Sequence, residues 1–239
     1  MINYLLTLFL TLASLSAHSQ SFEGVLKYKM NIETDKALEK SGLTKEMIID
    51  KMKEEGLFLE EETISYKEGN YCISSIKGKK ISSIYRKDKN KIYAFEEGTD
   101  VCAVTDAWID AETKLLGKKP EIKLIDTTVV IYNKPCKIVR VQWTTGYYDY
   151  YFSPDFLSIN PELYANHVYD GWAEYLRISK ALPVQVVKSV NGMMTIISTL
   201  EDVQVKPVDD ALFALPKMTA DKDVKIPMAP GKTIMTIKK

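Results

Sequence analysis

Apolar and polar residues alternate along residues 22–33, FEGVLKYKMNIE. One parity carries Phe22, Leu26, Tyr28, Met30 and Ile32, and the other carries Glu23, Lys27, Lys29, Asn31 and Glu33. A period of two is typical of a β-strand with one buried face and one solvated face. We therefore expect the segment to form a strand at the start of a sheet.

The pattern changes in residues 43–56, LTKEMIIDKMKEEG, where apolar residues return at helical spacing. Thr44 is a suitable N-cap, Ile48 and Met52 fall on one face, and Gly56 is a suitable end for the helix. These features predict a helix that interrupts the strands.

Between residues 62 and 152 the chain consists of short apolar stretches separated by Gly, Asp, Asn and Lys clusters. The clusters recur at intervals of about ten residues, which is typical of an antiparallel meander. We expect a run of hairpins over this part of the chain.

A second helix is predicted after Asn160, a suitable N-cap that is followed by Pro161 and Glu162. Residues at helical spacing then share one side: Tyr164, Val168, Trp172, Tyr175 and Ser179. A strand pair follows over residues 182–205, and its Asn191-Gly192 dipeptide suits a type I′ turn.

Residues 217–239 contain three Met, two Pro and many Lys without a clear hydrophobic period, so we expect a loosely attached tail. No repeat or linker divides the rest, which predicts one domain over residues 20–216. Many strands and two helices without βαβ alternation indicate an α+β, mostly β, fold with an antiparallel sheet wrapped against the helices.

The N-terminus indicates export. Residues 4–15 form an apolar run of signal-peptide length, too short to span a bilayer, although no Lys or Arg precedes it. Ala17 and Ser19 suit a peptidase site, so we expect residues 1–19 to be removed. No cysteine lies at that site to accept a lipid. We expect a periplasmic or secreted protein without stable membrane insertion.

The charge is balanced, with 32 Lys and Arg against 32 Asp and Glu, so no net field attracts a polyanion. Basic residues occur in mixed clusters that suit solvated turns. We expect no nucleic-acid partner.

Motifs for catalysis are absent. His167 is the single histidine after residue 19, which excludes multi-histidine zinc sites, and we expect no metal and no cofactor. Asp149 and Asp155 could act as the paired carboxylates of a glycan-acting hydrolase, but carboxylates near strand ends are common. We expect a protein that is not an enzyme.

The strongest chemical signal is the aromatic strand around residues 143–152, WTTGYYDYYF. Its two faces both carry aromatic rings, which suits either a core with a packed helix or the wall of an apolar cavity. The candidate ligand-binding residues are Trp143, Tyr148, Tyr150 and Trp172, with Met47 and Met52 of the first helix as a lid.

Three cysteines, Cys72, Cys102 and Cys136, each fall in a strand of a different predicted hairpin. In an oxidising compartment one pair can close a disulfide, and all three pairings are open. A buried thiol is the other interpretation of Cys136, since no neighbouring base or cation would activate it.

The order of these motifs resembles that of exported bacterial proteins akin to the GLPGLI family, whose function is not established. More distantly, it resembles the LolA-like and LolB-like carriers of outer-membrane lipoproteins. The resemblance rests on residues 132–137 before the aromatic strand, on Leu182-Pro183, and on residues 208–216, VDDALFALP. Asn133 and Pro135 depart from the family pattern. The resemblance implies an incomplete, LolA-like half-barrel curled around one or two helices above an apolar groove, with Cys136 structural.

Three functions follow in order of preference. The first is a periplasmic protein that binds a lipid, an acyl chain or another hydrophobic small molecule. The second is a structural or interaction protein of the cell envelope, whose barrel is filled by its own side chains. The third is the glycan-acting hydrolase.

Overall fold

β1 (Gly24–Thr34) shows the expected alternation, with Leu26, Tyr28 and Ile32 buried and Lys29 and Asn31 exposed. This strand belongs to a computed structural model that describes residues 21–35, 38, 40, 42–54, 60–77, 79–220 and 232–237. The predicted signal peptide, residues 1–19, lies outside the described residues.

Within the described residues, thirteen strands form one antiparallel sheet in the order β12-β13-β6-β5-β4-β3-β2-β1-β11-β10-β9-β8-β7. Hairpins join most neighbours, and β11 returns to pair with β1 in the middle of the sheet. The other strands are β2 (Glu61–Lys67), β3 (Asn70–Lys77), β4 (Lys79–Arg86), β5 (Lys91–Glu96), β6 (Val101–Asp106), β7 (Glu121–Ile131), β8 (Lys134–Gln142), β9 (Gly146–Phe152), β10 (Gln185–Val190), β11 (Met194–Val205), β12 (Met218–Ala220) and β13 (Lys232–Ile237).

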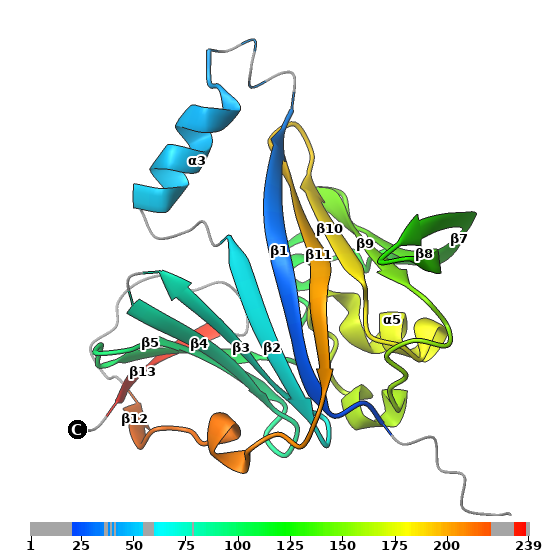
Figure 1. Cartoon of the computed structure of the whole chain (residues 1–239). Helices are drawn as coiled ribbons and strands as arrows, with labels where there is room; N and C mark the ends of the chain where they lie inside the picture. The colour runs from blue at the N-terminus through cyan, green and yellow to red at the C-terminus, as the bar shows by residue number, and fades with distance from the viewer. Residues whose placement is uncertain are drawn as a thin grey trace, which may run out of the picture.

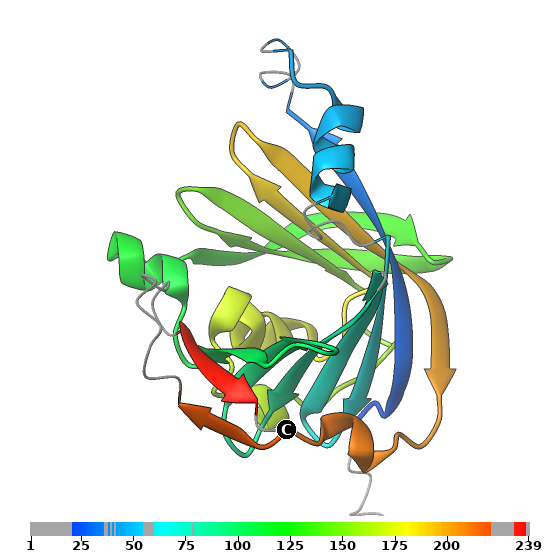
Figure 2. The same cartoon turned by 90° about the vertical axis from the view of Figure 1, so that its left-hand side faces the viewer.

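The sheet curves into a trough (Figures 1 and 2). It is not closed into a barrel, because β12 and β7 remain its two edges. The predicted mostly β fold with one antiparallel sheet is therefore confirmed at this level. The side that faces into the trough is called the inner face below, and the opposite side the outer face.

The helices take different positions around the trough. α5 (Trp172–Ser179) lies inside the curve and packs against β7 and β8 (Figure 2). α3 (Lys45–Glu54) lies beyond the end of the sheet near β1, and the hydroxyl of Thr44 accepts a hydrogen bond from the Met47 backbone N–H, as expected of an N-cap. α4 (Ala111–Leu116) connects β6 to β7.

The core lies between the inner face and the segment that connects β9 to β10. Leu26, Val139 and Val141 come from the sheet and meet Tyr175 and Leu176 of α5, all of them nearly inaccessible to solvent. Burying five such side chains contributes about 1.5–3 kcal/mol each. This segment fills only part of the trough.

The second predicted helix is interrupted. Asn160 caps only a short 3₁₀ turn, η1 (Pro161–Tyr164), and a second 3₁₀ turn, η2 (Tyr169–Gly171), precedes α5. Asp170 and Gly171 have φ angles of +58° and +70°, which no helix accommodates. A side chain at Gly171 would collide with Val141, so close packing on β8 fixes this break.

The type I′ turn occurs at a different hairpin from the one predicted. Tyr132 and Asn133, between β7 and β8, both have positive φ, as that turn requires. Between β10 and β11 only Gly192 has positive φ, and the connection has three residues, 191–193. The predicted hairpin is present, but its predicted turn type is wrong.

The segment after β11 covers part of the outer face. Val208, just before η3 (Asp210–Phe213), and Phe213, the last residue of η3, pack with Cys72 and Ile84. Farther along, β13 pairs with β6 and with β12, and their Met and Ile side chains pack against Tyr93 and Cys102. The prediction of a loosely attached tail is wrong for these two strands.

All three cysteines are free and buried. Cys72 on β3 and Cys102 on β6 are three strands apart, and Cys136 on β8 is farther away. At about 4.8 Å per strand these separations exceed the reach of a disulfide. The disulfide prediction is wrong, and the buried-thiol interpretation of Cys136 is confirmed.

A candidate ligand-binding cavity

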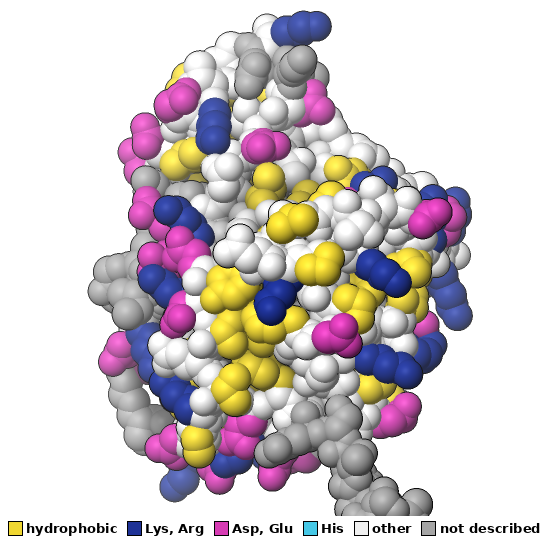
Figure 3. All heavy atoms as spheres, turned by 45° about the vertical axis from the view of Figure 1, so that its right-hand side comes forward, with side chains coloured by type: hydrophobic (Ala, Val, Ile, Leu, Met, Phe, Trp, Pro, Cys, Tyr) yellow, Lys and Arg dark blue, Asp and Glu magenta, His cyan; other side chains and the backbone are white. Residues whose placement is uncertain are grey.

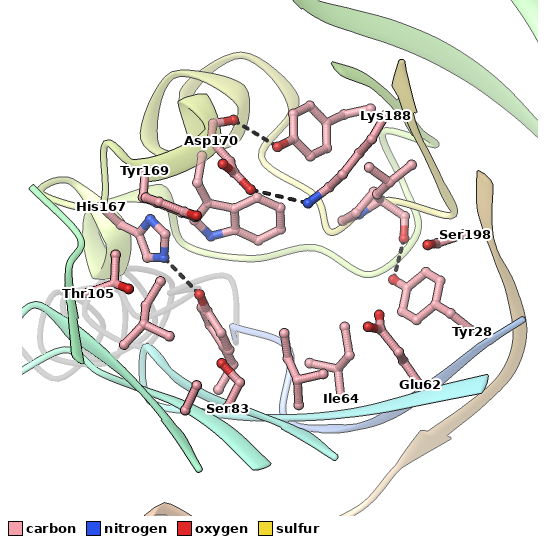
Figure 4. Close-up of a pocket in the computed structure, with 18 of the residues that line it drawn as sticks. Tyr28, Glu62, Ile64, Ser83, Thr105, His167, Tyr169, Asp170, Lys188 and Ser198 are labelled. Atoms are coloured by element: carbon pink, nitrogen blue, oxygen red, sulfur yellow. Dashed lines mark hydrogen bonds and ion pairs between the residues drawn. The ribbon is translucent and has the colours of Figure 1, made fainter. Parts of the chain in front are cut away.

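The inner face surrounds a cavity of about 400 Å³ (Figure 4). Strands from β13 to β9 and the segment before β10 contribute its walls. Its apolar wall includes Ile64, Ile73, Ile92, Tyr150, Trp172 and Val186, and its polar positions include Glu62, Ser83, Thr105, Asp170, Lys188 and Ser198. The combination gives a largely apolar space with a few fixed polar groups.

One end of the cavity is formed around His167, which is 2% exposed. Its Nε2 atom lies 2.9 Å from the hydroxyl oxygen of Tyr71, and its ring lies 4.5 Å from the ring centre of Tyr85. Burial lowers the pKa of His167 to about 4, so the imidazole is neutral near pH 7. This histidine packs and hydrogen-bonds in the wall as an uncharged ring.

An ion pair lies on the other side of the cavity, between Lys188 of β10 and Asp170 of η2 (Figure 4). The Lys188 Nζ atom lies 3.2 Å from the Asp170 Oδ2 atom and 4.8 Å from the ring centre of Tyr148. Tyr150 donates a hydrogen bond of 2.8 Å to the Asp170 backbone carbonyl, which fixes this turn to the sheet. Burial lowers the pKa of Lys188, but the attraction of Asp170 and its other neighbours more than reverses this effect, so the pKa is raised and the ammonium stays charged.

Glu62 of β2 reaches into the same side of the cavity (Figure 4). It is half-buried and directly opposite Tyr28 in the register of β1 and β2. Burial raises the pKa of the Glu62 carboxyl, and Lys188 lowers it by a smaller amount. The Tyr28 hydroxyl donates a 2.6 Å hydrogen bond to the Pro183 carbonyl, and Glu62 makes no hydrogen bond or ion pair within the described residues.

Two of the six predicted binding residues, Tyr150 and Trp172, line this cavity. Trp143 and Tyr148 pack behind it, with their rings 4.9 Å apart, and the Trp143 indole N–H donates to Asp110. Met47 and Met52 lie on α3, outside the cavity wall. Of the aromatic strand β9, Tyr150 lines the cavity, and the ring of Tyr148 packs against that of Tyr150.

Asp149 and Asp155 do not meet in the cavity. Asp149 faces outward from β9 and is held by two hydrogen bonds of 2.6 and 2.7 Å from Arg140, whose guanidinium lies over Tyr147. Asp155 is exposed beyond the end of β9. This arrangement offers neither carboxylate to a substrate in the trough.

Metal and thiol chemistry find no support in the part of the chain that the structure describes. There, no group of three or more His, Cys, Asp and Glu side chains is placed to hold a metal ion. Burial raises the pKa of Cys72 and Cys136, and that of Cys102 to about 11, so the thiols stay protonated.

The outer face differs in composition from the cavity. Figure 3 brings the side of β7 to β10 forward and shows hydrophobic side chains interspersed with Lys, Arg, Asp and Glu. On the outer face of these strands Tyr151, Val187 and Ile197 are partly exposed. Among the described residues, no helix has the length and apolar character needed to cross a bilayer.

Sequence reasoning missed Glu62, Asp170 and Lys188. A signal existed for two of them, because Glu62 shares the parity of Ile64 and Tyr66, and Lys188 shares that of Val186. A charged residue at an otherwise apolar inward position marks a site that needs a charged partner. Asp170 had no such signal, because its position depends on the broken helix.

Comparison with known proteins identifies no family for this chain, so the interpretation of the cavity rests on its geometry. No protein-family model and no curated protein sequence matches the chain. A solved structure of PNGF-II in space group P2₁ is similar over 80% of this chain at 12% identity, with a TM-score of 0.41, and one in space group C2 is similar at 13% identity, with a TM-score of 0.30. The matched region spans about 30% of the length of PNGF-II.

Proposed function

We propose that this chain is an exported binding protein that holds an apolar or amphipathic small molecule in the trough of its sheet. The cavity of about 400 Å³ is the observation that supports the proposal. Small-molecule sites are typically concave, mostly apolar and about 300–1,000 Å³ in volume. A lipid or acyl chain has the required chemistry, and a LolA-like groove and periplasmic location belong to the same proposal.

The surface left open in the trough favours a ligand over a filled core. Ile64, Ile73 and Trp172 are only partly buried although they face inward. Covering such apolar surface stabilises a complex by roughly 25 cal/mol per Å² before the costs of association. A scaffold filled by its own side chains, the second candidate, would not leave this surface accessible.

Native mass spectrometry of protein purified from the periplasm, followed by organic extraction, tests the proposal. We expect a co-purifying hydrophobic molecule with a discrete mass. Protein that carries no such molecule and binds no apolar probe after extraction contradicts the proposal.

A filling variant assigns any binding to this cavity. Ala94 of β5 lies in the wall, so Ala94→Trp should occupy the space and reduce binding of the neutral fluorescent probe N-phenyl-1-naphthylamine by about tenfold or more. Lys29→Trp places the same side chain on the exposed outer face of β1 and is the matched control. Equal probe binding by the two variants would place the site elsewhere.

A further inference from the structure

The charges in the cavity are unevenly distributed. Glu62, Asp170 and Lys188 lie on the same side of it, beside Tyr28 and Ser198 (Figure 4). With Glu62 ionised, this group holds two carboxylates and one ammonium. Lys232, the other cation in the wall, is on β13, five strands from β2, or about 24 Å along the curved sheet.

Lys188 is already committed to partners in the protein. Its ammonium pairs with Asp170 and lies over the ring of Tyr148. An anionic ligand at this position would have to compete with Asp170 and would also face Glu62. The local charge therefore disfavours an anion here.

Glu62 is in the opposite situation. Its carboxyl lies on the cavity wall without a hydrogen bond or ion pair from any described residue. By contrast, Asp149, a buried carboxylate on the outer face of β9, accepts two hydrogen bonds from Arg140. Partly buried carboxylates are normally paired, and among the described residues only the more distant charge of Lys188 acts on Glu62, so a ligand can supply the missing partner.

The surroundings of Glu62 suit an organic cation. Tyr28 lies directly across the strand from it, and Tyr66 follows on the same face of β2. Aromatic faces attract ammonium groups, and the attraction increases when the group leaves bulk water. Ile64 and Ile73 continue the wall with apolar surface that suits a hydrocarbon tail.

We propose that Glu62 binds the ammonium group of an amphipathic amine whose apolar part lies along the inner face of β2 and β3. This assignment rests on the proposed binding function and adds the ligand class to it. The complex balances the local charge, with one ammonium from Lys188 for Asp170 and one from the ligand for Glu62.

Three ligands with the same tail test the assignment. Decylammonium, decanol and decanoate are titrated below their micelle concentrations into the mature protein by isothermal titration calorimetry at pH 7.5. We expect decylammonium to bind most tightly and decanoate most weakly. Glu62→Gln should weaken decylammonium binding roughly tenfold or more, which is typical of a lost hydrogen bond to a charged group, and should leave decanol within about twofold.

Two controls separate a local effect from a change in overall charge. Glu61→Gln removes a neighbouring carboxylate that faces outward and pairs with Lys27, and we expect it to leave all three affinities unchanged. Lys232→Met removes the distant cavity cation and should not weaken decylammonium binding. Near-UV circular dichroism should show the same fold for every variant.

The outcomes distinguish the two proposals. Tightest binding of decanoate, or an equal loss of decylammonium binding in Glu61→Gln and Glu62→Gln, overturns the role of Glu62. Binding of decanol without any preference for the amine overturns the ligand class while leaving the binding function in place. Absence of binding by all three ligands overturns both proposals.

Discussion

Asp149 on the outer face of β9 and Glu62 on the inner face of β2 are carboxylates on one sheet, but the chain surrounds them differently. The Asp149 side chain is 5% exposed and has a bidentate partner in Arg140, its direct neighbour on β8. Glu62 is half-buried, has no partner within the described residues, and faces a cavity.

Under the proposed function, the difference separates a structural charge, Asp149, from a charge that contacts the ligand, Glu62. Removing one partner of a buried ion pair leaves the other charge uncompensated, and this lowers the free energy of unfolding. An unpaired carboxyl in a partly buried position costs stability, and such groups are found where a ligand supplies the partner. On the outer face Asp149 thus has its partner in the chain, and under the proposed function a ligand supplies the partner of Glu62 on the inner face.

The largest expected effect comes from breaking the outer pair. Arg140→Met leaves Asp149 buried without a partner and should lower the free energy of unfolding by about 3 kcal/mol, measured by urea denaturation. The double variant Arg140→Met/Asp149→Val removes both charges and should lie within about 1 kcal/mol of the wild type. Equal destabilisation by the single and double variants would show that packing, and not the unpaired charge, explains the loss.

The next effect concerns His167 and pH. Its pKa is about 4 in the folded chain and 6.5 ordinarily, so between these values the unfolded chain binds the extra proton. Stability due to His167 is therefore complete above pH 6.5 and decreases by about 3 kcal/mol as the pH falls towards 4. Urea denaturation of the mature protein at a series of pH values measures the decrease.

The matched variant for this titration is His167→Gln, which keeps a side chain able to hydrogen-bond to Tyr71. The carboxylates titrate in both proteins, so the difference between the two stability curves isolates the histidine. A difference that stays constant from pH 7 to pH 4 would mean that His167 has the same pKa in the folded and unfolded chains, which contradicts the lowered pKa.

The smallest expected effect is a gain. Burial raises the pKa of Glu62, which means that its ionised form is unfavourable in the folded chain at neutral pH. Glu62→Gln removes that charge and should raise the Tm of the ligand-free protein by roughly 1–2 °C in differential scanning calorimetry. Glu61→Gln, which removes an exposed ion pair with Lys27, should give no increase. A lower Tm for Glu62→Gln would indicate that this carboxylate is structural.

The strands were predictable because they are encoded locally. The parity of Leu26, Tyr28 and Ile32 already assigns one face of β1 to the core, since a pleated strand turns alternate side chains to opposite sides. The same rule placed Tyr148 and Tyr150 on one face of β9. The rule could not predict that Tyr150 lines the cavity whereas Tyr148 packs against Trp143 and does not line it.

The helix after Asn160 shows where local reasoning stops. Its residues have helical spacing, yet the chain breaks at Asp170 and Gly171 because Val141 of a distant strand allows no side chain there. That break brings Asp170 to Lys188 and creates the ion pair of the cavity. The cysteines give the same lesson, because only the order of the strands shows that none can reach another.

The sequence by itself determined the mostly β character, the hairpins of the meander and the inward faces of the strands, because alternation and turn residues act over a few neighbouring positions. Only the tertiary structure decided that the sheet stays open, that the C-terminal strands join its edge and that Glu62, near the Asp170–Lys188 pair, has no hydrogen-bond or ion-pair partner among the described residues. These features depend on contacts between residues far apart in the chain, and a local hydrophobic pattern contains no record of which distant side chain will fill a given space.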